Sequence, residues 1–347
     1  MQHQAGRVLV TGGAGYFGST LIDALRARGD AVRVLDLASD SSLPPDVEYI
    51  RADIRDRDAV ARACAGMGVV HHCVAQVPLA RDRALFLSVN AEGTRVLLEQ
   101  AQRAGVRKVV HLSSSAVFGV PERNPVTADT PVHPQEAYGR AKLEAERMCA
   151  RAAADGLDVT VIRPRTILGH GRLGIFQILF EWVRTGLNVP VLGDGSNVYQ
   201  FVHAADLADA CLRAAGTPGA ATFNIGAAEF GTMRETLEAL ASHAGTGSRV
   251  VSLPKTPAVA AMRLTAALRL SPLAPYHWLM YGESMYFDVA PARAALGWAA
   301  RYSNREMMIE AYDWYVAHRD EILAARSRSP HRSALNQGIL RLVGRFI

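Results

Sequence analysis

The sequence predicts an α/β fold in which a parallel sheet is covered by helices on both faces. Through the first half of the chain, short apolar runs alternate with longer runs of helical periodicity. The apolar runs are continuous, as expected for strands that are buried on both faces of a sheet. With 347 residues, of which 49% are hydrophobic, the chain can bury a full core and carry a second, smaller lobe.

The first strand is expected at 7–10, followed by a glycine-rich turn and a helix at about 16–28. The glycines fit two registers of a dinucleotide-binding pattern, Gly13-x-Gly15-x-x-Gly18 and Gly12-x-x-Gly15-x-x-Gly18. A side chain in this turn would keep the backbone away from a pyrophosphate, a group that binds well at the positive end of a helix. The strand, turn and helix therefore predict a Rossmann-type, doubly wound domain at residues 1–165.

The second strand, 31–36, ends on the carboxylate of Asp36. This carboxylate can accept hydrogen bonds from a ribose diol, and its charge would repel a 2′-phosphate. The sequence therefore predicts NAD rather than NADP as the cofactor.

The remaining elements continue the alternation. Further strands are expected at 47–50, 68–73, 106–112 and 159–162, and helices at 52–65, 90–104 and 138–154. The alternation loosens after Arg163, which predicts a smaller C-terminal substrate-binding lobe at 166–322, with returns of the chain to the sheet near 199–210 and 222–226. This lobe would cover the carboxyl ends of the strands, where open α/β sheets bind their ligands.

Charge and cysteine content narrow the range of partners. Much of the net charge of +5 comes from the tail, 323–347, which holds arginines and no acidic residue. The body has no basic face with interleaved aromatic residues, so nucleic acid is not an expected partner. The four cysteines are scattered without the spacing of metal ligands, so no metal is expected. We see no signal peptide and no run of about eighteen apolar residues, and we expect a cytoplasmic protein.

The end of the tail has several interpretations. Over 339–347, apolar residues at helical spacing are interrupted by Arg341 and Arg345. Such a segment can lie as a basic amphipathic helix on an anionic membrane surface, which would make a peripheral membrane contact. The alternatives are a helix that docks on the body or on a second subunit, and a frayed end.

Tyr138 and Lys142 are four residues apart in a predicted helix and so share one face. A free phenol has a pKa of about 10, and a nearby cation lowers that pKa, which makes the phenol a usable general base. Ser114 follows a central strand, where its hydroxyl can polarise the same substrate oxygen. Lys142 would also hydrogen-bond the nicotinamide ribose. Together the three residues suit removal of a proton from an alcohol while a hydride leaves its carbon.

These motifs resemble the extended short-chain dehydrogenases/reductases of the NAD-dependent epimerase/dehydratase family, over residues 7–318. The matching segments are 11–18, 53–54, 72–75, 89–94, 113–119, 138–142, 163–164, 193–195, 199–208, 224–226 and 295–298. Counting back from Phe118 makes Ser114 the catalytic hydroxyl, with Ser115 as its competitor. The resemblance also implies a homodimer to which each subunit contributes two helices.

Under this resemblance, two sets of residues line the site. The cofactor set is Gly12, Gly15, Tyr16, Phe17, Gly18, Asp36, Asp53, Ile54, Val74, Ala75, Gln76, Asn90, Ser113, Tyr138, Lys142, Pro164 and Ile167. The substrate set is Gln76, Ser115, Arg165, Thr166, Tyr199 and Gln200.

Departures from the family pattern bear on the reaction. Sugar 4,6-dehydratases carry Asp-Glu after the catalytic hydroxyl, where this chain has Ser115 and Ala116. Dehydration, and the related decarboxylation that uses an acid there, are therefore disfavoured. Sugar-nucleotide enzymes often carry Asn and Arg where this chain has Thr166 and Tyr199. Arg165 and Arg172 are the candidates to replace the missing positive charge.

The first hypothesis is an NAD-dependent epimerase of a sugar nucleotide, in which hydride passes to bound NAD and returns to the other face of the sugar. The alternative is a dehydrogenase/reductase of a hydrophobic or lipid-linked alcohol, similar to the 3β-hydroxysteroid dehydrogenases. The apolar stretch 258–287 motivates this alternative, unless it is simply core. A non-catalytic NAD-binding protein is the third interpretation, but such a protein does not need Ser114, Tyr138 and Lys142.

Overall fold

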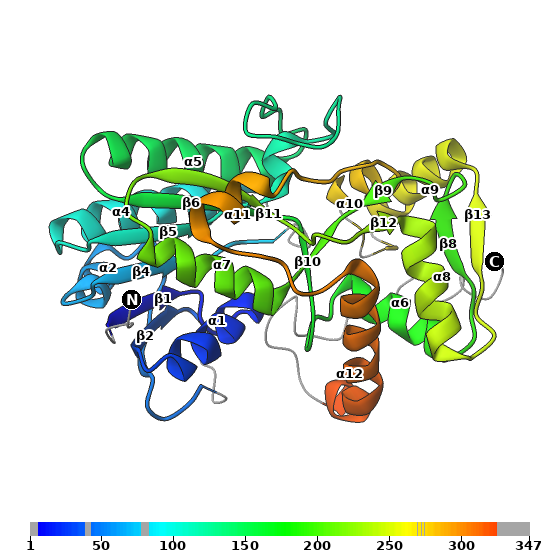
Figure 1. Ribbon diagram of the computed structural model, residues 1–347, viewed down its shortest axis with the longest axis horizontal. Helices are drawn as coiled ribbons and strands as arrows, with labels where there is room; N and C mark the ends of the chain where they lie inside the picture. The colour runs from blue at the N-terminus through cyan, green and yellow to red at the C-terminus, as the bar shows by residue number, and fades with distance from the viewer. Residues whose placement is uncertain are drawn as a thin grey trace.

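The computed structural model describes residues 6–38, 43–77, 83–268, 270–271, 273 and 275–324. Figure 1 shows a larger part built around one sheet and a smaller part beside it that contains α6, α8 and α12. In the described residues this sheet has seven strands in the order β3-β2-β1-β4-β5-β6-β11, and every neighbouring pair is parallel. The strands are β1 (Arg7–Thr11), β2 (Ala31–Asp36), β3 (Glu48–Arg51), β4 (Val69–His72), β5 (Lys108–Leu112), β6 (Val159–Pro164) and β11 (Ala221–Ile225).

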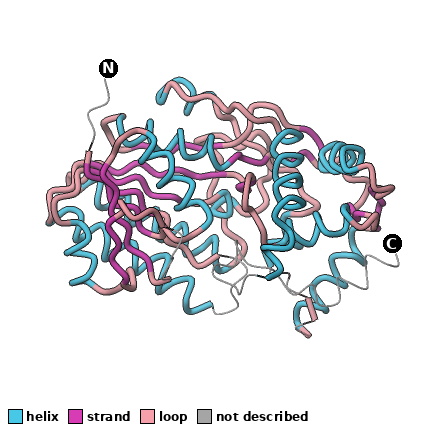
Figure 2. The backbone as a smooth tube through the Cα atoms, turned by 90° about the horizontal axis from the view of Figure 1, so that it is seen from below, coloured by secondary structure: helices cyan, strands magenta, loops and turns pink. Residues whose placement is uncertain are grey.

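Helices cover both faces of this sheet (Figures 1 and 2). They are α1 (Tyr16–Ala27), α7 (Ala204–Gly216) and α11 (Ala290–Leu296) on one face, and α2 (Arg57–Cys64), α4 (Gly93–Arg103) and α5 (Ala137–Ala154) on the other. Successive residues of β1 serve the two faces, since Val8 and Val10 join the first apolar cluster and Leu9 joins the second. The predicted doubly wound α/β fold is confirmed.

The glycine turn between β1 and α1 leaves no room for side chains. Gly12 has a φ of +76°, and a Cβ on it would lie 2.8 Å from the backbone nitrogen of Val74. A Cβ on Gly18 would overlap the carbonyl oxygen of Gly12. This close packing sets the N-terminus of α1, which has no side-chain cap, at the carboxyl end of β1. The first N–H groups of a helix have no partner within it, so this end of α1 is suited to an anion.

The smaller part contains three short sheets and several helices around a third apolar cluster. The strand pairs are β7 (Thr166–Leu168) with β10 (Phe201–His203), β8 (Val189–Leu192) with β13 (Val250–Leu253), and β9 (Val198–Tyr199) with β12 (Gly231–Thr232). The helices are α6 (Ile175–Arg184), α8 (Met233–Ala244), α9 (Lys255–Ala267), α10 (Pro275–Met280) and α12 (Asn304–Ala324). Short elements precede α4 and follow β5: α3 (Arg83–Leu85), the π-helix η1 (Phe86–Glu92) and the 3₁₀ turn η2 (Ser115–Phe118).

One of the two expected returns to the main sheet is found and the other is wrong. β11 joins the edge of the sheet beside β6, as expected for 222–226. The segment near 199 does not join it, because β10 pairs with β7, which continues the chain just beyond β6. β10 has only three residues and is satisfied by one short partner, and β7 in the smaller part is the strand that lies next to it.

The C-terminal tail lies outside the described residues from residue 325 onward, so the interpretations given for it above stay predictions. Within the described part of the chain, none of the helices has both the length and the apolar character needed to cross a membrane.

Three histidines are buried in the central strands, His71 and His72 in β4 and His111 in β5. The ring of His72 lies between two hydroxyls, with Nδ1 2.7 Å from Oγ1 of Thr11 and Nε2 3.0 Å from Oγ1 of Thr94. Burial lowers the pKa of His71 and of His72 to about 3, and that of His111 well below its usual value. All three are therefore neutral in the folded protein.

Acid should destabilise the fold through these histidines. Below pH about 6.5 the unfolded chain binds protons that the folded chain cannot, so each histidine lowers the free energy of unfolding by up to about 1.4 kcal/mol per pH unit. Above that pH their contribution is constant. Urea unfolding measured between about pH 7.5 and about pH 5 should show a weaker pH dependence for His111→Leu than for the wild type. The exposed His133→Leu is the control, and an unchanged pH dependence in His111→Leu would contradict the account.

Candidate active site

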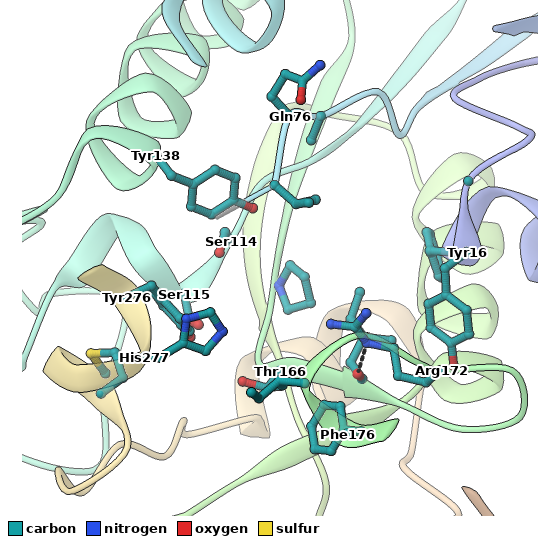
Figure 3. Close-up of a pocket in the computed structure, with 18 of the residues that line it drawn as sticks. Tyr16, Gln76, Ser114, Ser115, Tyr138, Thr166, Arg172, Phe176, Tyr276 and His277 are labelled. Atoms are coloured by element: carbon teal, nitrogen blue, oxygen red, sulfur yellow. Dashed lines mark hydrogen bonds between the residues drawn. The ribbon is translucent and has the colours of Figure 1, made fainter. Parts of the chain in front are cut away.

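A cavity of about 1030 Å³ opens over the carboxyl ends of β1, β4 and β5 and extends into the smaller part of the molecule. The glycine turn, Asp36 and Asp53 line one end, and residues of α6, α9 and α10 line the other. Figure 3 shows its middle, where Tyr138 and Ser114 face the cavity from one side and Arg172 and Tyr16 from the other.

Most residues predicted to bind the cofactor line this cavity. They are Gly12, Gly15, Tyr16, Phe17, Gly18, Asp36, Asp53, Ile54, Val74, Ala75, Gln76, Ser113, Tyr138, Lys142, Pro164 and Ile167. Asn90 is not among them. Its buried side chain instead bonds the backbone of Gln76, with Oδ1 accepting from the N–H at 2.7 Å and Nδ2 donating to the carbonyl at 3.0 Å. Asn90 therefore positions the segment that follows β4.

The cofactor end of the cavity fits a dinucleotide. The uncapped N-terminus of α1 and the guanidinium of Arg172 suit a diphosphate, and Nη1 of Arg172 is buried without a hydrogen-bond partner. Asp36 accepts the N–H groups of Ala14 and Ala38, both at 3.0 Å, which holds its carboxylate at the end of β2. Burial lowers the pKa of Arg172 to about 10, so it is a cation at neutral pH.

Asp53 is already engaged by a neighbour. Oδ2 accepts Nη2 of Arg55 at 2.6 Å and Oδ1 accepts Nε at 2.9 Å, and these bonds lower the pKa of Asp53. The carboxylate is thereby fixed in its charged form at the far end of the cavity.

The three predicted catalytic residues come together at the carboxyl end of β5. Glu136 caps α5 by accepting the N–H groups of Tyr138, at 2.6 Å, and Gly139, at 2.5 Å, which sets Tyr138 in the first turn. Ser114 begins the 3₁₀ turn after β5, where its Oγ accepts the N–H of Ala116 at 3.2 Å, and its side chain lies near the phenol of Tyr138 (Figure 3). Lys142, one turn further along α5, is buried and donates to the carbonyl of Leu112 at 2.7 Å.

The electrostatics of Tyr138 differ from the prediction. Burial raises the pKa of the phenol above its usual value, and the nearby hydroxyl of Ser114 only partly opposes this rise. Arg172 is a cation that lowers the pKa of Tyr138. Burial lowers the pKa of Lys142 itself to about 8. The ammonium of Lys142 donates to a carbonyl at the end of β5, and its expected action on the phenol stays a prediction.

Sequence reasoning missed Glu146 and Tyr276. Glu146 accepts the hydroxyl of Ser113 at 2.5 Å and both Nε and Nη2 of Arg163, at 2.9 and 2.6 Å, which braces the wall beneath the site. It lies four residues after Lys142 on the same helix, a spacing that could have indicated it. Tyr276 comes from α10, lines the cavity and helps to raise the pKa of Tyr138, and nothing local in the sequence connects the two.

Five of the six predicted substrate-binding residues line the cavity: Gln76, Ser115, Arg165, Thr166 and Tyr199. Gln200 does not, so this prediction is wrong. Its Nε2 donates to the carbonyl of Ala227 at 2.6 Å and its Oε1 accepts the N–H of Phe287 at 2.9 Å, inside the core. Consecutive residues of an extended segment point to opposite sides, so Tyr199 faces the cavity and Gln200 faces away from it.

The outer half of the cavity is apolar. Its lining includes Phe176, Leu179, Trp182, Val189, Leu192, Met233, Leu237, Ala258, Ala261, Met262, Met280 and Met308. α9 buries none of its residues in the core, and it instead contributes one face to this lining. Among the described residues that line the cavity, the only carboxylates are Asp36 and Asp53, both at the cofactor end.

Known proteins share this architecture. The model of the NAD dependent epimerase/dehydratase family matches residues 8–226. The chain is 52% identical to protein y4nG of Sinorhizobium fredii, over 96% of this chain and 85% of that protein. It is 34% identical to 3 beta-hydroxysteroid dehydrogenase/Delta 5-->4-isomerase of Mycobacterium tuberculosis, over 90% of this chain and 91% of that protein. The structure of MoeE5 in complex with UDP-glucose and NAD is similar with a TM-score of 0.72 and 27% identity, over 90% of this chain and 99% of that chain.

The match to the family covers well over half of the chain and includes the glycine turn, Asp36, Ser114, Tyr138 and Lys142. NAD, predicted from the turn and from Asp36, is the cofactor on which the family depends. The chain is an enzyme of the NAD-dependent epimerase/dehydratase family.

Proposed function

We propose that this enzyme is an NAD-dependent dehydrogenase/reductase of a hydrophobic alcohol. The observation that carries the proposal is the apolar outer half of the cavity, which is continuous with the groove that fits the cofactor. Apolar walls favour an apolar ligand by about 25 cal/mol for each Å² removed from water. They offer few partners to a sugar, a base or a diphosphate, whose polar groups lose water on binding.

Between the two halves, the hydroxyls of Thr166 and Tyr199 are occupied by each other. Thr166 and Tyr199 stand where the resemblance places the diphosphate-binding Asn and Arg, and their hydroxyls lie 2.8 Å apart. The guanidinium of Arg165 packs 4.7 Å from the centre of the Tyr199 ring. Arg172 lies 5.5 Å from the centre of the Tyr16 ring, on the side of the glycine turn. Its charge is therefore assigned to the cofactor rather than to a second nucleotide.

The residues around Tyr138 support hydride chemistry at an alcohol. When bound, NAD supplies the acceptor for the hydride that leaves the alcohol carbon. Tyr138 takes the hydroxyl proton during oxidation and returns it during reduction, while Ser114 donates a hydrogen bond to the same oxygen. Because burial raises the pKa of Tyr138, the phenol is protonated at neutral pH and is better suited to donate a proton than to take one.

Epimerisation of a sugar nucleotide is the second candidate. It is supported by the similarity to MoeE5, which was solved with UDP-glucose and NAD, and by the cation Arg172 in the cavity wall. The same tyrosine chemistry would serve, but the cofactor would stay bound and no net NADH would form.

Turnover assays separate the two candidates. Purified enzyme with NAD should form NADH in proportion to the amount of a long-chain secondary alcohol or a hydroxysterol consumed, since product release leaves the cofactor reduced. With UDP-glucose it should form neither NADH nor UDP-galactose. Formation of UDP-galactose without NADH would contradict the proposal and establish the epimerase.

A matched pair of variants tests whether the outer half of the cavity receives the substrate. Ala258 lines the cavity from α9, and Ala260 lies exposed on the same helix outside the lining. Ala258→Phe should lower kcat/KM for the long-chain alcohol, and Ala260→Phe should not. Equal effects of the two substitutions would place the substrate elsewhere.

Tyr138→Phe should abolish turnover without unfolding the site. The ring packs edge-on against Phe86 with centroids 6.0 Å apart, and this contact survives the loss of the hydroxyl. Loss of a general acid–base group should lower kcat by about 10²–10⁴-fold, with NAD affinity close to wild type by fluorescence titration. Tyr286→Phe, which is outside the cavity lining, serves as control. Wild-type kcat in Tyr138→Phe would eliminate the assigned role.

A further inference from the structure

Arg165 is a buried cation without an anionic partner. Its side chain follows β6, is 1% exposed and lies in the cavity wall. Nε and Nη2 have no hydrogen-bond partner, and no carboxylate pairs with the guanidinium among the residues that the structure describes. A buried charge is destabilising unless it is paired, so this arrangement calls for a ligand that supplies the missing charge.

The immediate neighbours of Arg165 are neutral. The guanidinium lies 4.7 Å from the centre of the Tyr199 ring and 5.7 Å from that of Phe287. Nη1 donates to Oγ of Ser115 at 2.9 Å and contacts the sulfur of Met285 at 3.2 Å. The aromatic faces reduce the cost of burying the cation but do not neutralise it.

The hydrogen bond from Arg165 makes the hydroxyl of Ser115 a donor toward the cavity. Because Oγ of Ser115 accepts from the guanidinium, its own proton is directed elsewhere and is available for donation to another group. The described residues provide no such acceptor, and Ser115 lines the cavity directly after Ser114. Figure 3 shows Ser114 and Ser115 on the same side of the cavity, near Tyr138 and Tyr276. A cation one hydrogen bond away also strengthens this O–H as a donor.

We propose that Ser115 and Arg165 form a subsite for an anionic oxygen of the substrate, a carboxylate or a phosphate close to the reacting hydroxyl. Ser115 donates its hydrogen bond to this oxygen, and Arg165 balances its charge from behind. The substrate is then amphipathic, with its anionic group beside the catalytic pair and its apolar body in the outer half of the cavity. This inference rests on the proposed function for the apolar body, and it adds the anionic group.

Binding to the NADH-loaded enzyme tests the subsite without turnover. The probes are dodecanoate, dodecyl phosphate and the neutral methyl dodecanoate, measured by calorimetric titration. The wild type should bind at least one anion about tenfold or more tightly than the ester, the gain expected for a hydrogen bond to a charged group. The tighter of the two anions identifies carboxylate or phosphate. Equal binding of both anions and the ester would overturn the proposal.

Substitutions assign the preference to the two residues. Arg165→Met, which keeps an unbranched side chain between the aromatic rings, should bring the ratio of anion to ester affinity close to one. Ser115→Ala should lower the ratio, and Arg165→Lys should retain part of it. Arg103→Met removes an exposed cation at the end of α4 and should keep the wild-type ratio. A wild-type ratio in Arg165→Met would overturn the assignment.

Thermal unfolding distinguishes a binding role from a purely structural one. If the role of Arg165 is to bind an anion, Arg165→Met removes an unpaired buried charge from the ligand-free protein. The Tm of this variant without ligand should then equal or exceed that of the wild type. A lower Tm with an unchanged affinity ratio would make Arg165 a structural residue and refute the subsite. The alcohol assays are independent of this comparison, so failure of the proposed dehydrogenase function and failure of the anion subsite give different results.

Discussion

The parallel pairing of β1, β4, β5 and β6 is the constraint on which the site depends. These strands are buried on both faces, so their side chains can reach a ligand where the strands end, and parallel strands all end at the same edge. Gly12 follows β1, Ser114 follows β5 and Arg165 follows β6. One edge therefore carries the glycine turn suited to an anion, the predicted catalytic hydroxyl and a cation without a carboxylate partner. The smaller part of the molecule covers this edge with apolar residues. The cavity joins these parts because the sheet has already aligned them.

The distribution of charge at this edge is one-sided. Lys142, Arg165 and Arg172 line the cavity, while its carboxylates, Asp36 and Asp53, lie at the far cofactor end. Burial lowers the pKa of Lys142 and of Arg172, because an apolar wall disfavours the charged form of each side chain. By contrast, Glu146 and Arg163 beneath the site form a complete two-bond pair. The paired charges therefore lie in the scaffold, and the cations without a carboxylate partner line the cavity that ligands enter. Such a departure from the usual pairing of buried charges is expected at a binding site.

Sequence signals that are local in the chain predicted their part of the molecule well. The strand, glycine turn and helix near Gly12 form one continuous segment, and Tyr138 and Lys142 lie on one helical turn, so both were predictable. Properties that depend on distant packing were not. The raised pKa of Tyr138 depends on burial and, to a smaller extent, on Tyr276 of α10, which is remote in the chain. The sequence pattern places Gln200 beside Tyr199 in the substrate site, and only the structure shows that the Gln200 side chain points into the core. The lack of a carboxylate around Arg165 is likewise visible only in three dimensions.

The central claim is that the outer half of the cavity holds the apolar body of an alcohol substrate. The most direct test is the dependence of kcat/KM on chain length for a series of 2-alkanols, with NAD held at saturation. Burial of each methylene contributes about 0.8 kcal/mol, so kcat/KM should rise by up to about fourfold per methylene until the cavity is filled, and then level off. If kcat/KM is independent of chain length, the apolar walls do not contact the substrate, and the account of this cavity is wrong.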